Sequence, residues 1–358
     1  MNRREFAMCG VGMGLNLIAL QGLRAQVPAQ ESSRPSPRTG VDRFALVDPE
    51  LLPAVKDSQL SPLTYEIVLS ARKQGAAIEA TLPSIPGVHI SKRTIPGAAG
   101  APDVPIVIAD TAPDRKNKPV LLHIHGGGYV LGAAEIFLPG VLRYAIPTGC
   151  VVVSVNYRLA PETRFPGALE DNYAALQWVY HHAEDLGIDP KRIAIAGESA
   201  GGGHAAALAI HARDRGEVPV LFQLLIYPML DDRTGSTRAV PPPIGQIAWG
   251  ADGNRYGWTS LLGIPAGSAK VPYRSVPARV ANLAGLPPAF IGVGAIDLFV
   301  DEDVEYARRL IAEAVPTELH VVPGAYHAFD LSVPGAQVSK RFTQSITVAL
   351  QRAFTNPA

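Results

Sequence analysis

The sequence predicts an α/β fold in which helices cover both faces of a mostly parallel central β-sheet. From about residue 104, short apolar runs alternate with stretches of helical spacing, as in a chain that passes repeatedly between strands and helices. The runs at 119–123 and 150–155 are continuous and rich in β-branched side chains, which suits parallel strands that are buried on both faces. Hydrophobic side chains make up 47% of the 358 residues, so the chain is able to bury a large core.

Strands are expected where apolar residues follow one another without interruption, and helices where they recur every three or four positions. The predicted strands are 119–123, 150–155, 192–196, 220–226, 289–293 and 318–322. The predicted helices are 166–186, 200–213, 301–314 and 337–354.

Two segments interrupt this alternation. Residues 41–80 are helical in character and precede the sheet, and residues 231–282 form an insertion rich in Pro, Gly and Trp. A structureless loop of that length is uncommon inside a compact domain. We therefore expect both segments to form a cap over the carboxyl edge of the sheet, where open α/β sheets bind ligands. The remaining residues, 81–230 and 283–358, form the expected core.

The aromatic residues of the insertion have two interpretations. Trp249, Tyr256 and Trp258 either line a pocket for the acyl or alcohol part of a substrate or form a small core of the cap itself. The sequence favours neither interpretation.

The N-terminus resembles an export signal. Arg3 and Arg4 precede an apolar stretch at 7–20, and Ala25 supplies a small residue before a plausible cleavage point. We expect a twin-arginine-like signal at 1–25, a Pro- and Ser-rich linker at 26–40, and a periplasmic or secreted protein. The alternative is an uncleaved N-terminal helix on a cytoplasmic protein. No stable membrane span is expected, because the apolar stretch is shorter than the roughly 20 residues of a membrane helix.

Charge and cysteine content exclude several other classes. The 32 basic residues balance 32 acidic ones, so nothing indicates nucleic acid or an anionic membrane as a partner. Removal of the signal would leave Cys150 without Cys9, which excludes an intramolecular disulfide. The spacing of the two cysteines also excludes the usual cysteine zinc site.

A candidate nucleophile lies between a predicted strand and a predicted helix. Ser199 occupies the centre of Gly197-Glu198-Ser199-Ala200-Gly201, and the Gly-x-Ser-x-Gly motif requires this strand–turn–helix setting. Small flanking residues such as Gly197 and Gly201 permit the sharp turn. The helix that begins at Ala200 directs free N–H groups towards the hydroxyl. The alternative is an ordinary glycine turn.

A second glycine motif, His125-Gly126-Gly127-Gly128, directly follows a buried strand. Consecutive glycines let backbone N–H groups converge on one point, as stabilisation of an acyl-transfer oxyanion requires. We predict that Gly127, Gly128 and Ala200 supply these N–H groups. His125 is expected to orient the loop and not to carry a proton. The alternative is a flexible glycine turn.

A serine nucleophile requires a general base. Only His320 and His327 lie in the last third of the chain. His320 falls within the strand predicted at 318–322, which suggests a packed or surface side chain. His327 follows a turn after that strand, where a loop can present it to Ser199, so we predict that His327 is the base.

The base requires an acid, which this kind of fold places between the serine and the histidine. Asp297 follows the strand predicted at 289–293 and lies at the carboxyl edge of the sheet. Asp301, Glu302 and Asp303 compete with it, but they begin a helix, where carboxylates cap N–H groups and complement the helix dipole. We therefore predict Asp297 as the acid.

Another group of polar residues follows a predicted strand. Tyr157, Arg158 and Glu162 belong to Tyr-Arg-Leu-Ala-Pro-Glu at 157–162. We interpret this segment as a structural turn with an internal ion pair and assign it no catalytic group.

Together these motifs resemble those of the hormone-sensitive-lipase-like family of bacterial carboxylesterases, within the α/β-hydrolase fold. The resemblance covers about residues 40–355, and Glu198 replaces the family's usual Asp. The matching segments are His-Gly-Gly-Gly at 125–128, Tyr-Arg-Leu-Ala-Pro-Glu at 157–162, the serine motif at 197–202, the acid motif at 297–302 and the histidine motif at 324–329.

The resemblance implies a helical cap and hydrolysis of short- to medium-chain acyl esters through an acyl-enzyme, without a metal or organic cofactor. A lactonase, an amidase or an aryl- or xenobiotic-ester hydrolase with the same triad remains an alternative. A non-catalytic binding module is the least favoured. The sequence leaves open the natural ester and the oligomeric state, a homodimer included.

Overall fold

A computed structural model describes residues 42–79 and 82–355 of the chain. The predicted export signal at 1–25, the predicted linker at 26–40 and Cys9 lie outside the described residues. Cys150 is buried. Within the described ranges, no helix combines the length and apolar character that crossing a membrane requires.

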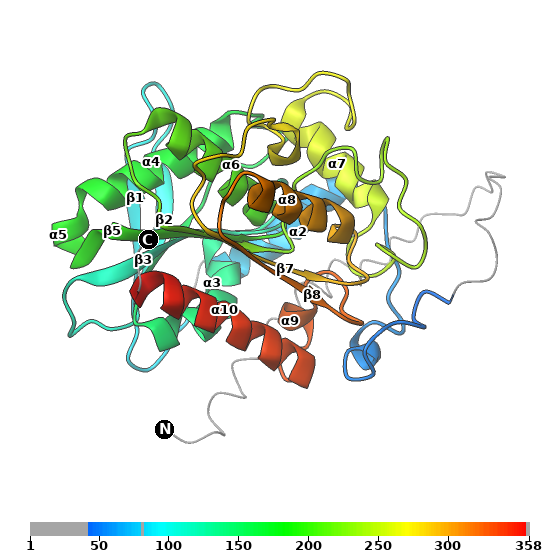
Figure 1. Cartoon of the computed structure of the whole chain (residues 1–358), viewed down its shortest axis with the longest axis horizontal. Helices are drawn as coiled ribbons and strands as arrows, with labels where there is room; N and C mark the ends of the chain where they lie inside the picture. The colour runs from blue at the N-terminus through cyan, green and yellow to red at the C-terminus, as the bar shows by residue number, and fades with distance from the viewer. Residues whose placement is uncertain (1–41, 80–81, 356–358) are drawn as a thin grey trace.

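The described residues form one eight-stranded sheet with helices on both faces (Figure 1), which confirms the predicted fold class. The strand order is β1-β2-β4-β3-β5-β6-β7-β8. The β1–β2 and β2–β4 pairs are antiparallel, and every later pair is parallel. The strands are β1 His89–Ile95, β2 Val104–Asp110, β3 Lys118–Ile124, β4 Val151–Val155, β5 Ile188–Glu198, β6 Phe222–Ile226, β7 Ala289–Gly294 and β8 Thr317–Val322.

Two buried layers cover the sheet. One contains side chains of α4, α6 and α8, and the other contains side chains of α3 and α10 (Figure 1). Val120 and Leu122 of β3 enter the first layer and Leu121 enters the second, because side chains alternate along a strand. The helices are α2 Tyr65–Glu79, α3 Ala134–Ala145, α4 Gly167–His181, α5 Ala183–Leu186, α6 Ala200–Arg215, α7 Ala251–Leu262, α8 Val300–Ala312, α9 Phe329–Ser332 and α10 Gln337–Thr355.

Each predicted strand and helix is present, but some boundaries differ and several elements were not predicted. The helix predicted at 166–186 is interrupted at His182, whose φ of −107° and ψ of 27° leave the helical region, so α4 and α5 are separate. β1 was missed because most of its side chains are exposed or half-buried and polar. β2 was also missed, although it is mostly buried and apolar, because Pro105 interrupts its apolar run. α3 was missed because Pro139 lies inside it and its first turn has no side-chain cap.

Helices from the two segments predicted as a cap meet loops that follow the strands of the sheet. Val68 of α2 and Trp258 of α7 belong to one buried cluster together with Ala200, Met229 and other loop residues. Apart from these two helices, the segments consist mainly of turns and short 3₁₀ helices. We use the term cap for residues 42–79 and 231–282.

Candidate active site

Ser199 occupies the turn between β5 and α6 in an unusual backbone conformation, with φ 56° and ψ −122°. Such a conformation costs energy in a non-glycine residue and persists only where its surroundings hold it. The Ser199 N–H donates to the Ile226 carbonyl at 2.9 Å, and the Ser199 carbonyl accepts from the Met229 N–H at 2.9 Å. The turn is therefore held from the end of β6.

Two glycines allow this turn to close. A Cβ on Gly197 would lie 2.2 Å from the Gly201 carbonyl oxygen, and a Cβ on Gly201 would lie 2.0 Å from the Ile124 oxygen. Both separations are far below any normal contact, so only glycine fits at either position.

Ser199, His327 and Asp297 form one continuous hydrogen-bonded series. His327 Nε2 lies 3.0 Å from Ser199 Oγ, and His327 Nδ1 lies 2.8 Å from Asp297 Oδ2. Asp297 is fully buried, and its Oδ1 accepts the Phe299 N–H at 3.0 Å. The rings of Phe299 and Tyr227 pack edge-on against the imidazole. An imidazole held in this way is able to accept the hydroxyl proton while the carboxylate stabilises its charged form.

The loop at 125–128 lies against the serine turn. A Cβ on Gly126 would lie 3.4 Å from Ser199 Cβ. Among the described residues, the N–H groups of Gly127, Gly128 and Ala200 have no hydrogen-bond acceptor. Gly127 has φ 123° and Gly128 has φ 60°, backbone angles that glycine adopts easily and that other residues disfavour. The loop therefore offers unused donors beside the nucleophile, as an oxyanion requires.

His125 lies at the base of this loop. Its Nδ1 donates to the Gly126 carbonyl at 2.8 Å, and its ring stacks on Tyr157 with the centroids 4.3 Å apart. The Tyr157 hydroxyl donates to the His125 carbonyl at 2.8 Å. These contacts hold the loop from within, and burial lowers the pKa of His125 to about 4.

His204 on α6 gives a testable pH dependence. Burial lowers its pKa to about 3, whereas an unfolded histidine titrates near 6.5. Between these values the unfolded chain binds more protons, so this residue's contribution to stability falls as the pH drops below about 6.5. At about 1.4 kcal/mol per pKa unit, we expect the wild type to lose roughly 2 kcal/mol more than His204→Gln between pH 7 and pH 5.

Urea unfolding of both proteins at the two pH values gives the change in unfolding free energy of each. The contributions of the other titrating groups are the same in both proteins, so they cancel in the difference. Equal losses would show that His204 is protonated in the folded protein at pH 5.

The competing carboxylates at the start of α8 do not contact His327. Asp301 is exposed, while Glu302 is buried and accepts the N–H groups of Leu230 and Asp231 at 2.6 and 3.1 Å. Asp303 is also buried, and burial raises its pKa well above the ordinary range. All three carboxylates lie in the first turn of α8, where they complement the helix dipole as expected. The expectation that they cap its N–H groups was wrong, because the start of α8 has no side-chain cap hydrogen bond.

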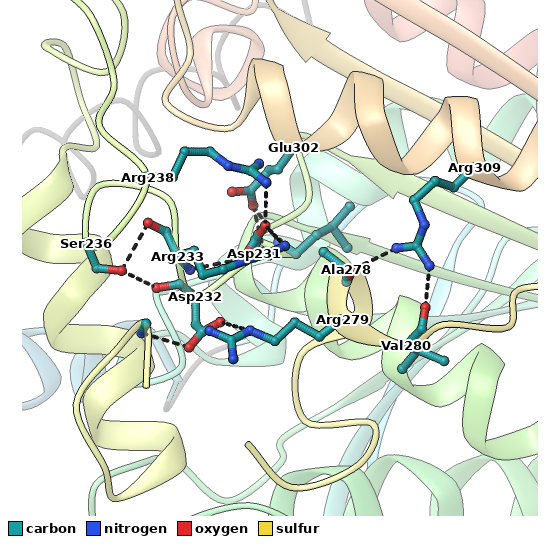
Figure 2. Close-up of polar contacts among 12 residues, drawn as sticks. Asp231, Asp232, Arg233, Ser236, Arg238, Ala278, Arg279, Val280, Glu302 and Arg309 are labelled. Atoms are coloured by element: carbon teal, nitrogen blue, oxygen red, sulfur yellow. Dashed lines mark hydrogen bonds and ion pairs between the residues drawn. The ribbon is translucent and has the colours of Figure 1, made fainter. Parts of the chain in front are cut away.

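Glu302 belongs to a polar network that joins α8 to the beginning of the cap insertion (Figure 2). In this network Asp231 pairs with Arg233 at 2.8 Å and with Arg238 at 3.4 Å. Asp232 pairs with Arg279 at 2.7 Å. The network lies beside the residues that follow β6, among them Met229, so it supports the serine turn indirectly.

The predicted ion pair within 157–162 was wrong. Arg158 pairs with Asp171 of α4 at 2.8 Å, and Glu162 pairs with Arg72 of α2 at 2.9 Å. Both partners come from elements remote in sequence, which a local pattern does not reveal. His320 pairs with Glu318 on β8, at 2.7 Å.

The structure separates the aromatic residues of the insertion. Trp258 is fully buried and packs against Tyr129, with the ring centroids 4.9 Å apart. Tyr256 is half-buried against the same cluster. Trp249 also packs against this cluster, and in addition it lines a cavity of about 1410 Å³ together with Ser199, His327 and the glycine loop. Its ring is so close to the loop that a Cβ on Gly128 would lie 2.5 Å from Cη2.

Comparisons with known proteins agree with this geometry. A family model described as alpha/beta hydrolase fold matches residues 121–331. Esterase LipI of Mycobacterium tuberculosis (strain ATCC 25618 / H37Rv) is 36% identical over 300 residues, which cover 82% of this chain and 91% of that protein. Carboxylesterase NlhH of the same strain is 38% identical over 265 residues, which cover 70% and 80%. The solved structure of a bacterial heroin esterase aligns with a TM-score of 0.78 at 39% identity, covering 87% of this chain and 99% of that one.

Proposed function

The chain belongs to the hormone-sensitive-lipase-like family of α/β hydrolases and is a carboxylic ester hydrolase, and we propose that it works through an acyl-enzyme on Ser199. The continuous hydrogen-bonded series from Asp297 through His327 to Ser199 is the observation that carries this proposal.

The proposed reaction has two halves. His327 accepts the hydroxyl proton as Ser199 Oγ attacks the ester carbonyl, and Asp297 stabilises the imidazolium. The N–H groups of Gly127, Gly128 and Ala200 stabilise the oxyanion. His327 then protonates the departing alkoxide. Water, deprotonated by the same imidazole, attacks the acyl-enzyme and releases the acid.

We propose short- to medium-chain acyl esters as substrates. Esters of aryl or xenobiotic alcohols are a second candidate class. The cavity favours it, because about 1410 Å³ exceeds the roughly 300–1,000 Å³ of most ligand pockets and Trp249 adds an aromatic wall.

A matched substrate series tests the acyl-chain proposal and the preference for esters over amides. With the purified protein, p-nitrophenyl esters from acetyl to dodecanoyl are expected to give the highest kcat/KM between butyryl and octanoyl. The p-nitroanilide of the preferred acid is expected to react far more slowly, because an amine leaves less readily than a phenolate. An anilide rate equal to the ester rate would indicate an amidase, and a monotonic rise to dodecanoyl would contradict the chain-length proposal.

We also propose export through the twin-arginine pathway. The support is the pair Arg3 and Arg4 before an apolar stretch. Residues 1–40 fused to a reporter are expected to deliver it to the periplasm of a bacterial host. Replacing both arginines with lysine is expected to retain it in the cytoplasm, and unchanged delivery would contradict the proposal.

A further inference from the structure

A second buried polar cluster lies directly beneath the serine turn, and the reaction above uses none of its side chains. The Oγ of Ser154, on β4, lies 2.7 Å from His123 Nδ1, and His123 Nε2 lies 2.8 Å from Glu198 Oε2. The Tyr144 hydroxyl of α3 donates to Glu198 Oε1 at 3.2 Å. His123 and Ser154 are fully buried, and Glu198 and Tyr144 are 3% and 4% exposed.

The central hydrogen bond of this cluster joins two neighbouring parallel strands at their carboxyl ends. β3 pairs with β5 so that His123 lies opposite Ala196 and Ile124 lies opposite Gly197. β3 continues into the glycine loop at 125–128, and Glu198 immediately precedes Ser199. The bond therefore ties the strand that carries the oxyanion donors to the strand that carries the nucleophile.

Such a pair does little for stability by itself. Burying a carboxylate and an imidazole costs free energy, and well-packed apolar residues of similar volume often stabilise a core as well or better. The position of the pair suggests another benefit. Oxyanion donors act only when they lie within about 2.7–3.1 Å of the developing charge, and a misplacement of about 1 Å costs on the order of 10²-fold in rate.

Building on the proposed function, we propose that His123 and Glu198 are a positioning pair that sets the separation between the glycine-loop donors and Ser199. Glu198 is among the residues that line the cavity, but its two carboxylate oxygens bond to His123 and to Tyr144, so they are occupied within the cluster. The pair acts through the backbone of β3 and β5. Its loss is therefore expected to weaken stabilisation of the oxyanion and to change substrate binding much less.

A double-mutant cycle tests this proposal. The variants are His123→Phe, Glu198→Leu and their combination, assayed on p-nitrophenyl butyrate. Each single variant is expected to lower kcat by roughly 10- to 100-fold, with KM changed less than about threefold, because the lost stabilisation belongs to the transition state. The double variant is expected to lose no more than the worse single one, since the two residues act as a unit.

Two further variants separate positioning from charge and from general damage. Glu198→Gln keeps an oxygen that accepts from His123 and is expected to stay within about fivefold of wild-type kcat, since a kept hydrogen bond keeps most of the geometry. Tyr144→Phe removes the contact from α3 but not the link between the strands, and is expected to change kcat less than about threefold. Melting temperatures and titration of active sites with a fluorophosphonate probe normalise every kcat to folded, reactive protein.

Three results would overturn the proposal: single variants whose kcat per titrated site equals that of the wild type, additive losses in the double variant, or a Gln variant as slow as the Leu variant. If Glu198→Leu does not fold, His123→Phe is compared with Glu198→Gln, and a wild-type kcat in the first or an equally low kcat in the second overturns the proposal. Failure here leaves the proposed function intact, because that function depends on Ser199 and not on this pair.

Discussion

Replacing Ser199 with alanine is expected to lower kcat on p-nitrophenyl butyrate by roughly 10⁵- to 10⁶-fold. The variant loses the only group that bonds to the acyl carbon, so His327 has no hydroxyl to deprotonate. The N–H groups of Gly127, Gly128 and Ala200 remain, and they stabilise the oxyanion only weakly when bulk water is the attacking group. Fluorophosphonate labelling is expected to disappear together with turnover.

The matched control for this variant is Ser345→Ala on α10, which removes a serine that bonds only locally, to the Phe342 carbonyl. This variant is expected to keep wild-type activity and labelling. Retention of more than a few per cent of activity by a folded Ser199→Ala protein would assign the chemistry to another group.

Replacing Asp297 with asparagine is expected to lower kcat by on the order of 10⁴-fold. The amide has nearly the same shape, but its NH₂ group donates towards His327 Nδ1. The imidazole must then carry its proton on Nε2, where it faces Ser199 and cannot accept the hydroxyl proton. KM is expected to change little, because the carboxylate is fully buried behind the histidine.

Asp301→Asn is the control, since Asp301 is an exposed carboxylate four residues further along the chain. It is expected to stay within about threefold of the wild type, as is usual for an exposed side chain that bonds to none of the described residues. A severe loss in the Asp301 variant, with melting temperature preserved, would transfer the acid role to that residue.

The strands, the main helices and the meeting of Ser199, Asp297 and His327 follow from patterns that are local in sequence. Buried strands are continuous apolar runs, and the loops that follow parallel strands meet at one edge of the sheet. Chain order then restricts which loop supplies which group. For the same reason β1 was not predicted, because an exposed edge strand has no apolar run.

What the sequence did not predict depends on partners that meet only in three dimensions. Arg158 pairs with Asp171, and Glu162 pairs with Arg72. Each pair joins two elements whose relative position cannot be read from a local sequence motif. Trp258 lies within α7 and is fully buried, whereas Trp249 precedes α7 and lines the cavity, and this difference depends on how the insertion folds. The contact between His123 and Glu198 requires the register of β3 on β5, which is a property of the assembled sheet.

Arg72 determines how this enzyme can be recombined with its relatives. Its guanidinium donates to the Val130 carbonyl, just past the glycine loop, and to the Ala160 carbonyl, and it also pairs with Glu162. Arg72 therefore links helix α2 to the segment 129–162, and the two are best transferred together when parts of related enzymes are exchanged. A chimera that takes α2 from one parent is expected to need Glu162 from the same parent, and one that changes Trp249 must keep room for its ring against Gly128.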